Sequence, residues 1–219
     1  MSSDDELLDV LDESGSLTGE TRTREEVHRS GAWHRVFHLW IVRDSGTHSG
    51  TNNGTLLLQR RSLHKDLEPN KVDVTVGGHL RAGESVFDAV REVEEEIGLE
   101  VQPERLVHLG SWRSERSYPE ARDREFQEVF ALICDWPLDR YSLDCREVYI
   151  LYELPLSRAL ALYREGAPVP AAGYDCQYRI NDALLVEDDL IEQARASVSE
   201  QLAALSTWLA SSQTQPADN

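Results

Sequence analysis

The stretch that most constrains the fold is residues 77–100, GGHLRAGESVFDAVREVEEEIGLE. A glycine-containing loop leads into Ser85 and Asp88, which have the spacing of a capping box, so we expect a helix over about 86–97 that stops at Gly98. The apolar residues of this segment recur on one helical stripe and must face a core: Val86, Val90, Val93 and Ile97.

A second stripe of the same helix gathers like charges. At about 100° per residue, Glu92, Glu95 and Glu96 fall together with Asp88, whereas Glu94 points away from them. Like charges at this spacing cost stability, and a divalent cation would offset that cost. Several carboxylate oxygens within a few Å are the ligands that Mg²⁺ or Mn²⁺ prefers. The alternative is a solvated acidic face.

This stretch resembles the signature of the Nudix hydrolases. Gly78, a five-residue spacer and Glu84 are followed by the block Arg91-Glu-Val-Glu-Glu-Glu-Ile-Gly-Leu99. Six residues separate Glu84 from Arg91, one fewer than in the family's usual pattern. A deletion inside a helix would turn Glu84 by about 100° relative to the later glutamates, so we expect Glu84 to lie outside the metal cluster.

The resemblance covers residues from near 33 to about 154 and implies an α/β Nudix fold, with a mixed sheet in an α/β/α sandwich. It also implies metal-dependent hydrolysis of a diphosphate bond in a nucleoside diphosphate derivative or a related small diphosphate. The cofactor would be Mg²⁺ or Mn²⁺, with Arg91 orienting the carboxylates. The implied metal ligands are Glu92, Glu95, Glu96 and the carbonyl of Gly77 or Gly78.

Further residues are candidates for the chemistry. A carboxylate must accept a proton from the attacking water; Glu92 or Glu95 could do so, and Glu125 on an expected strand is the outside candidate. The basic residues of LLLQRRSLHK could hold the substrate's phosphates or could simply be solvated: Arg60, Arg61 and Lys65. The group beyond the diphosphate would be read by loops such as 113–124 and by the C-terminal extension.

Two other functions compete with hydrolysis. The chain also resembles type 1 isopentenyl-diphosphate isomerase, but Gly77 stands where that enzyme has a cysteine. A catalytically silent nucleotide-binding module of the same fold is the third possibility, and the complete glutamate set argues against it.

Composition narrows the range of partners. With 22 Lys and Arg against 40 Asp and Glu, the net charge of −18 repels nucleic acid at long range. Neither a secretory leader nor a run of about 18 apolar residues occurs, so we expect a soluble, cytoplasmic protein without membrane contact. The three cysteines lack disulfide-framework or metal-ligand spacing, and we expect them to be ordinary packing residues.

Four segments are expected along the chain: an N-terminal hairpin and polar lead-in over 1–32, a Nudix domain over 33–156, a C-terminal helical extension over 157–209 and a disordered tail over 210–219. Within the extension we expect a short helix at 156–166, a proline-bearing connector and a second helix from Asn181. The apolar face of that helix needs either the domain or a second subunit, so a homodimer is possible. The strands are expected at 36–42, 55–59, 72–76, 105–112, 125–133 and 147–154.

Overall fold

The computed structural model describes residues 6–43 and 54–212, and its sheet contains strands at the expected places together with several others. The single strand expected over 72–76 is instead divided into two. Eleven strands of the described residues join one sheet. They are β1 (Leu7–Leu11), β2 (Leu17–Thr23), β3 (Trp33–Arg43), β4 (Thr55–Arg61), β5 (Val72–Asp73), β6 (Val76–His79), β7 (Val107–Ser117), β8 (Arg122–Ile133), β9 (Val148–Pro155), β10 (Val169–Asp175) and β11 (Ile180–Leu185). The helices are α1 (Arg24–Ser30), α2 (Arg91–Ile97), α3 (Leu156–Glu165) and α4 (Arg195–Ser212).

Strand β3 is the centre of the sheet. It pairs in parallel with β8 along most of its length, and the other pairings of the described strands are antiparallel, so the sheet is mixed. On its other edge, β3 pairs with two strands. The C-terminal end of β3 pairs with β4, only at Val42 and Arg43, and its middle pairs with β6, at Val36–Leu39. The sheet therefore splits between β4 and β6, and this split opens the space in which the site lies.

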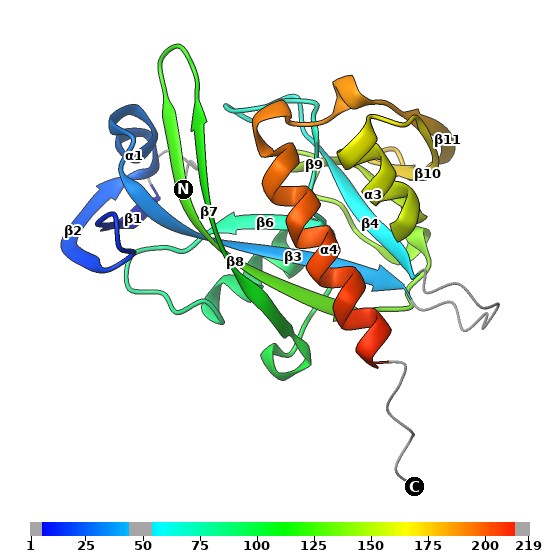
Figure 1. Cartoon of the computed structure of the whole chain (residues 1–219), viewed down its shortest axis with the longest axis horizontal. Coiled ribbons are helices and arrows are strands. Elements are labelled where there is room, and N and C mark those ends of the chain that lie inside the picture. The colour runs from blue at the N-terminus through cyan, green and yellow to red at the C-terminus, as the bar shows by residue number, and fades with distance from the viewer. Residues whose placement is uncertain (1–5, 44–53, 213–219) are drawn as a thin grey trace, which may run out of the picture.

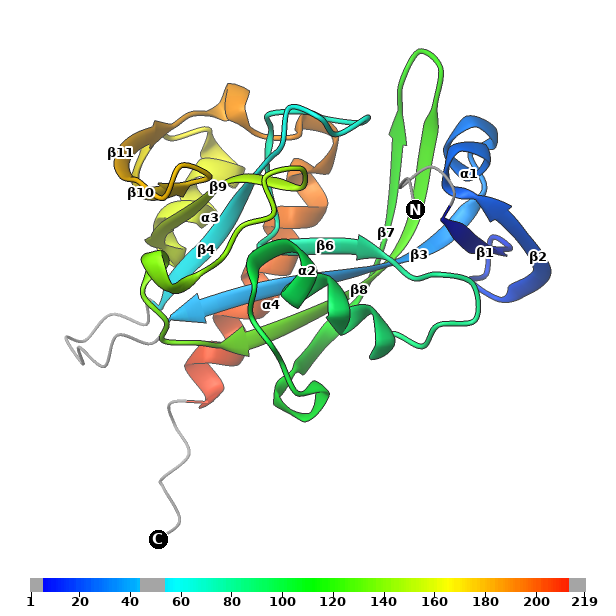
Figure 2. The ribbon, with the colours of Figure 1, turned by 180° about the vertical axis from the view of Figure 1, so that it is seen from behind.

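Helices cover both faces of the sheet. In Figure 1 α4 lies across the near face beside α3, and Figure 2, from behind, shows α2 on the opposite face. Alternate residues of β3 belong to the two cores: Trp40 and Val42 pack toward α3 and α4, whereas Phe37 and Leu39 pack toward α2. This arrangement confirms the expected α/β Nudix sandwich with a long C-terminal helix.

The apolar face of α4 packs on the domain itself. Val198, Leu202 and Leu205 are buried in the core that contains Trp40, and the indole N–H of Trp40 donates to Gln201 Oε1 at 3.3 Å. Of the two partners considered for this face, domain or second subunit, the structure therefore provides the domain.

Several local expectations were wrong. Residues 24–30, in the expected polar lead-in, form the helix α1, whose N-terminus is capped by a capping box between Thr23 and Glu26. The expected loop 113–124 is mostly strand, because β7 and β8 form a long hairpin. The connector after α3 is β10, and the helix expected from Asn181 is first β11 and begins only at Arg195. The disordered tail expected over 210–219 lies largely outside the described residues.

The expectation for the cysteines was also wrong. Cys145, in the loop before β9, forms a disulfide with Cys176, at the end of β10. Only Cys134 is the buried packing residue that was expected. The bond fastens the loop that precedes β9 to the β10–β11 hairpin.

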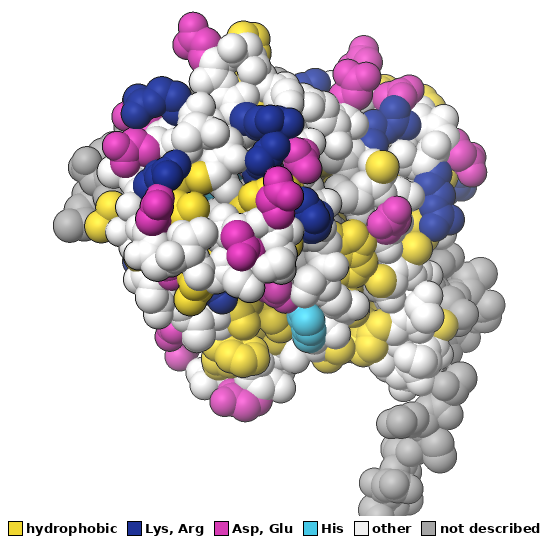
Figure 3. Space-filling view, turned by 60° about the vertical axis from the view of Figure 1, so that its left-hand side comes forward, with side chains coloured by type: hydrophobic (Ala, Val, Ile, Leu, Met, Phe, Trp, Pro, Cys, Tyr) yellow, Lys and Arg dark blue, Asp and Glu magenta, His cyan; other side chains and the backbone are white. Residues whose placement is uncertain are grey.

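No helix among the described residues is long and apolar enough to cross a membrane. On the face shown in Figure 3, basic and acidic side chains are interspersed over the upper part and apolar side chains gather below. This face therefore offers a polyanion no continuous basic surface.

Candidate active site

Helix α2 is short and begins later than expected. A single 3₁₀ turn, Asp88–Val90, precedes it, and the α-helical hydrogen bonds start only at Arg91. Gly98 ends the helix with φ +69°, and its N–H donates to the carbonyl of Glu94. Because Val93 and Ile97 are fully buried, the helix is held in one rotation about its axis.

That rotation turns three of the glutamates into a cleft of about 1220 Å³, which both halves of the split sheet line. Glu92, Glu95 and Glu96 line it from α2, whereas Glu94 is exposed and is absent from its wall. The other walls include Gly77 and Gly78 of β6, Arg61 of β4, Asp73 of β5 and Glu125 of β8.

Gly78 is a point of close approach between α2 and the sheet. It pairs with Phe37 of β3, and the Glu92 side chain lies directly over it. A Cβ at Gly78 would stand 2.6 Å from Glu92 Cδ, a separation that real atoms do not adopt. The missing side chain therefore lets the Glu92 carboxylate lie against the β6 backbone.

Arg91 gathers the carboxylates around it. Its guanidinium donates to Glu84 at 3.0 Å, to Glu92 and, more weakly, to Glu95 at 3.4 Å. Glu84 also accepts from the backbone N–H of Arg81 at 2.8 Å and does not line the cleft. The one-residue-shorter spacer thus leaves Glu84 outside the cleft, in contact with Arg91.

Burial changes the ionisation of two glutamates. It raises the pKa of Glu92 to about 7, although the charge of Arg91 acts in the opposite direction. It raises the pKa of Glu96 to about 8, against the lowering effect of Lys65, whose Nζ lies 3.9 Å from Glu96 Oε1. Glu96 Oε2 is buried and accepts no hydrogen bond from the described residues.

Two of the three basic candidates line the cleft and one does not. Arg61 and Lys65 line the cleft, where Arg61 pairs with Asp73 at 3.0 Å and Lys65 pairs with Glu147. Arg60 is not on its wall. Its guanidinium instead donates to Asp189 and to the Tyr152 hydroxyl, both at 2.8 Å, because neighbouring residues of a strand point to opposite faces.

Glu125 lies in the cleft wall with both oxygens occupied. Oε1 accepts from Arg116 at 2.6 Å, and Oε2 accepts from the Gln127 amide at 2.7 Å. Arg116 also donates to Asp123 at 2.6 Å, so a buried arginine is shared between two buried carboxylates.

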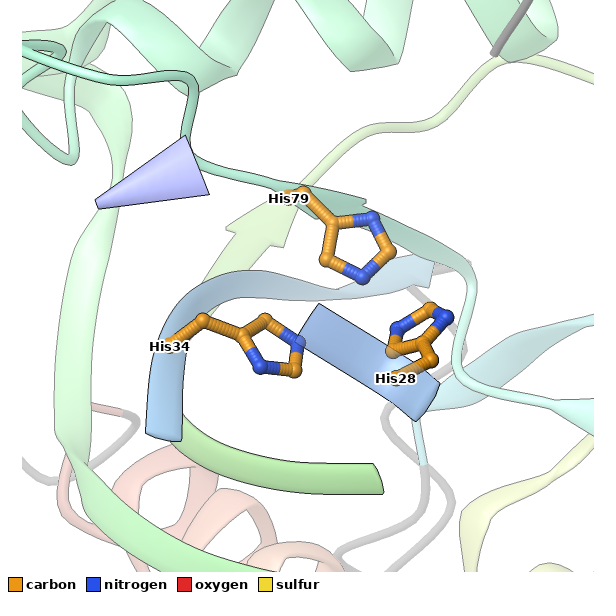
Figure 4. Close-up of side chains that lie close together, drawn as sticks. All are labelled: His28, His34 and His79. Carbon is orange, nitrogen blue, oxygen red and sulfur yellow. The ribbon is translucent and has the colours of Figure 1, made fainter. Parts of the chain in front are cut away.

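The cleft also contains a group of histidines that were not predicted from the sequence. His28 and His34 lie beside Asp123, and His79, from the distant strand β6, joins them; Figure 4 shows the three histidine side chains. A signal was present: Asp123, Glu125 and Gln127 recur at every second position of β8, and His34 and His38, four residues apart, share one face of the buried strand β3.

Comparisons with known proteins agree with this geometry. Residues 33–144 match the NUDIX domain family. An uncharacterized Nudix hydrolase of Clostridium acetobutylicum is 35% identical over 153 residues, which cover 70% of this chain and 71% of the relative. An isopentenyl-diphosphate Delta-isomerase of Streptomyces avermitilis is a more distant homologue, 30% identical over 135 residues that cover 60% of this chain and 64% of that protein.

Among solved structures, a Deinococcus radiodurans protein superimposes with a TM-score of 0.53 at 22% identity, covering 71% of this chain and 87% of that one. This likeness concerns the fold. The family match, the relatives and the glutamate helix beside the split sheet lead to one assignment: the chain belongs to the Nudix hydrolase family.

Proposed function

We propose that this protein is a Mg²⁺-dependent hydrolase that cleaves the diphosphate bond of a nucleoside diphosphate derivative or a related small diphosphate. The observation that carries the proposal is the set of three glutamates that one short helix directs into one cleft: Glu92, Glu95 and Glu96. Membership of the Nudix hydrolase family gives that set its chemical context.

The donor set fits a hard divalent cation. Glu96 Oε2 is buried without a hydrogen-bond donor among the described residues, and burial raises the pKa of Glu92 to about 7 and that of Glu96 to about 8 despite the nearby Arg91 and Lys65. Glu92, Glu95, Glu96 and the carbonyl of Gly78 would hold Mg²⁺ or Mn²⁺. When bound, the cation supplies Lewis-acid stabilisation of the phosphate oxygens and a more acidic water.

The protein's own side chains bind the phosphates, orient the carboxylates and accept a proton. Arg61 and Lys65 bind the phosphates from the β4 side of the cleft, and a phosphate oxygen replaces Glu147 as the partner of Lys65. Arg91 orients Glu92 and Glu95, and one of these two carboxylates accepts the proton of the attacking water. Glu125 is less suited to that role, because both of its oxygens already accept hydrogen bonds.

The experiment is a substrate screen with Mg²⁺, covering nucleoside triphosphates, nucleotide sugars, dinucleoside polyphosphates and prenyl diphosphates. Wild type and Glu94→Gln should hydrolyse the same substrate at similar rates, because Glu94 is exposed and lies outside the cleft. Glu92→Gln and Glu96→Gln should each lose at least about 100-fold in kcat. Unchanged turnover in both of these variants would overturn the assignment.

The same screen separates the two competing functions. An isomerase would convert a prenyl diphosphate to its isomer without releasing phosphate. That reaction needs proton transfer to and from the alkene, and Gly77 offers no side chain for it. A silent binding module would bind a nucleotide and turn over none of the panel.

A further inference from the structure

One disulfide bond ties the wall of the cleft to the C-terminal part of the chain. Cys145 lies in the loop 142–147, which has neither helix nor strand, and Cys176 lies at the turn between β10 and β11. Three residues of that loop line the cleft: Asp144, Arg146 and Glu147. The bond therefore joins part of the candidate active site to a hairpin that lies beyond the family match at residues 33–144.

The loop also supports two groups of the proposed site. The backbone N–H of Asp144 donates to the carbonyl of Glu96, near the C-terminal end of α2, at 2.9 Å. The Glu147 side chain pairs with Lys65, whose Nζ lies 3.9 Å from Glu96 Oε1. The position of one proposed metal ligand and that of one proposed phosphate ligand thus depend on the same short loop.

The two ends of the bond differ in how firmly they are held. Cys176 lies in a tight turn. There the Asp175 carboxylate accepts from the backbone N–H of Gln177 at 2.9 Å and from that of Arg179 at 3.1 Å. Cys145, by contrast, is exposed in a segment without regular structure. The bond therefore holds the less regular segment against a firm support.

The surroundings of the bond suit both its oxidised and its reduced state. Because Cys145 is exposed, a thiolate in solution can reach the bond, and exposed disulfides are among those that are readily reduced. The sulfur of Cys176 lies 3.1 Å from the carbonyl oxygen of Val148, which can accept a hydrogen bond from a Cys176 thiol. The new S–H group of the reduced protein therefore already has a partner.

We propose that the Cys145–Cys176 bond is a thiol–disulfide switch that controls the order of the loop 142–147 and, through that loop, turnover in the cleft. The reductant is a dithiol. One of its thiolates attacks Cys145 Sγ, the S–S bond breaks, and Cys176 leaves as a thiolate that takes up a proton. The second thiol of the reductant then displaces Cys145 from the mixed disulfide. Two electrons and two protons pass to the protein, and the dithiol becomes an intramolecular disulfide.

The bond acts on the freedom of the loop. Reduction removes the covalent tie but none of the loop's hydrogen bonds, so the loop opens more often without unfolding the domain. Each opening releases the Glu96 carbonyl and the Lys65 side chain from their partners in the loop. The effect on turnover rests on the hydrolysis proposed above, whereas the effect on the order of the loop does not.

The test compares amide hydrogen exchange of the full chain with and without dithiothreitol, read by mass spectrometry. Titration of free thiols in the unfolded chain verifies that the bond has been reduced. Reduction should speed exchange over 142–147 and at the end of α2 by at least about fivefold. It should leave the β1–β2 hairpin, at the opposite edge of the sheet, unchanged. No rise over 142–147, or an equal rise in the β1–β2 hairpin, would overturn the proposal.

Variants assign the effect to this bond. Cys145→Ser/Cys176→Ser should show the exchange of reduced wild type, with or without dithiothreitol. Cys134→Ala, which removes the buried cysteine outside the bond, should respond to dithiothreitol as wild type does. Exchange that still responds to dithiothreitol in the double variant would overturn the proposal.

Turnover provides the second readout. With a substrate from the screen above, reduction should lower kcat/KM of wild type and of Cys134→Ala by about 10-fold, and re-oxidation should restore it. Unchanged kcat/KM in reduced wild type would overturn the switch. Faster exchange over 142–147 in a protein that hydrolyses none of the panel would support the control of loop order and overturn the proposed hydrolysis.

Discussion

At the scale of single residues, Gly78 shows how the site depends on close approach. Gly78→Ala would push the new methyl group into the Glu92 side chain, which lies 2.6 Å away at Cδ. We expect kcat to fall by about 10-fold or more, because Glu92 must leave its place against β6. A matched Gly77→Ala change meets the Val74 side chain at 3.2 Å and His38 at 3.5 Å, both far less severe approaches than the one at Gly78. Steady-state kinetics on both variants would check this, and equal losses would contradict it.

A site residue can be predicted from the sequence when its neighbours in the site lie close to it in the chain. Glu92, Glu95 and Glu96 could be placed together because three and four residues along a helix always return to one face. Arg60 was misplaced because TLLLQRR is buried on both faces and shows no alternation that would tell Arg60 from Arg61. The histidine cluster depends on the pairing of β3 with β6 and β8, and such long-range register is not written in any one segment.

At the scale of elements, the spacer before α2 alters the helix itself. The expected start at about residue 86 was wrong, because Ser85 donates its N–H and hydroxyl to Asp88 and the chain makes only a 3₁₀ turn before Arg91. This irregular segment brings Glu84 within 3.0 Å of Arg91 despite the missing residue.

We therefore expect Glu84 to be a positioning residue whose loss is mild. Glu84→Gln removes one charge from the contact with Arg91 but keeps a hydrogen-bond acceptor, so we expect a smaller loss in kcat than for Glu96→Gln. Comparison of kcat for the two variants tests this. Losses of the same size would place Glu84 among the groups that hold the cation.

The burial of α2 carboxylates predicts how pH affects the metal-free protein. In the unfolded chain Glu92 and Glu96 ionise near 4.5, but in the folded chain their pKa values are about 7 and about 8. Over that interval the folded state holds more protons than the unfolded state, so these groups reduce stability as pH rises. In chelator, the unfolding free energy should fall between about pH 5 and about pH 8 and level off above that.

Glu92→Gln/Glu96→Gln is the control for this dependence, because it removes both titrating groups. Urea titrations at the two pH values should show a clearly smaller pH effect for the double variant. The same fall in both proteins would assign the effect to other groups.

The C-terminal strands show where local patterns mislead. Pro168 and Pro170 suggested a connector, yet β10 pairs with β9 only from Ala172 onward, so Pro170 lies beyond that pairing and removes no ladder hydrogen bond there. The apolar spacing from Asn181 suggested a helix, but Leu184 is exposed on β11 and only the residues after Arg195 pack as a helix. The strands of the central sheet, which are long and apolar, were predictable.

At the scale of the whole molecule, one covalent bond joins distant parts of the fold. The loop that carries Cys145 is hydrogen-bonded to the C-terminal end of α2. The Asp144 N–H donates to the Glu96 carbonyl, and the Ser142 N–H donates to the Ile97 carbonyl. Cys145 and Cys176 are 31 residues apart in sequence. The chain-entropy model gives a loop of that size roughly 3–4 kcal/mol of stabilisation.

Cys145→Ser/Cys176→Ser should lower the unfolding free energy by about that amount, measured by urea denaturation without reductant. Reductant should bring wild type to the stability of the variant and leave the variant unchanged. A double variant as stable as oxidised wild type would contradict a stabilising role for this bond.

The central claim is that the carboxylate face of α2 holds the divalent cation, and a thermal melt tests it most directly. A ligand that binds only the folded state stabilises it by RT ln(1 + [L]/Kd), which is roughly 2.7 kcal/mol at about 100-fold above Kd. Mg²⁺ should therefore raise the Tm of wild type and of Glu94→Gln by several degrees relative to chelator. It should leave Glu92→Gln/Glu96→Gln nearly unchanged. An equal rise in all three proteins would place the cation elsewhere on this acidic chain and contradict the account.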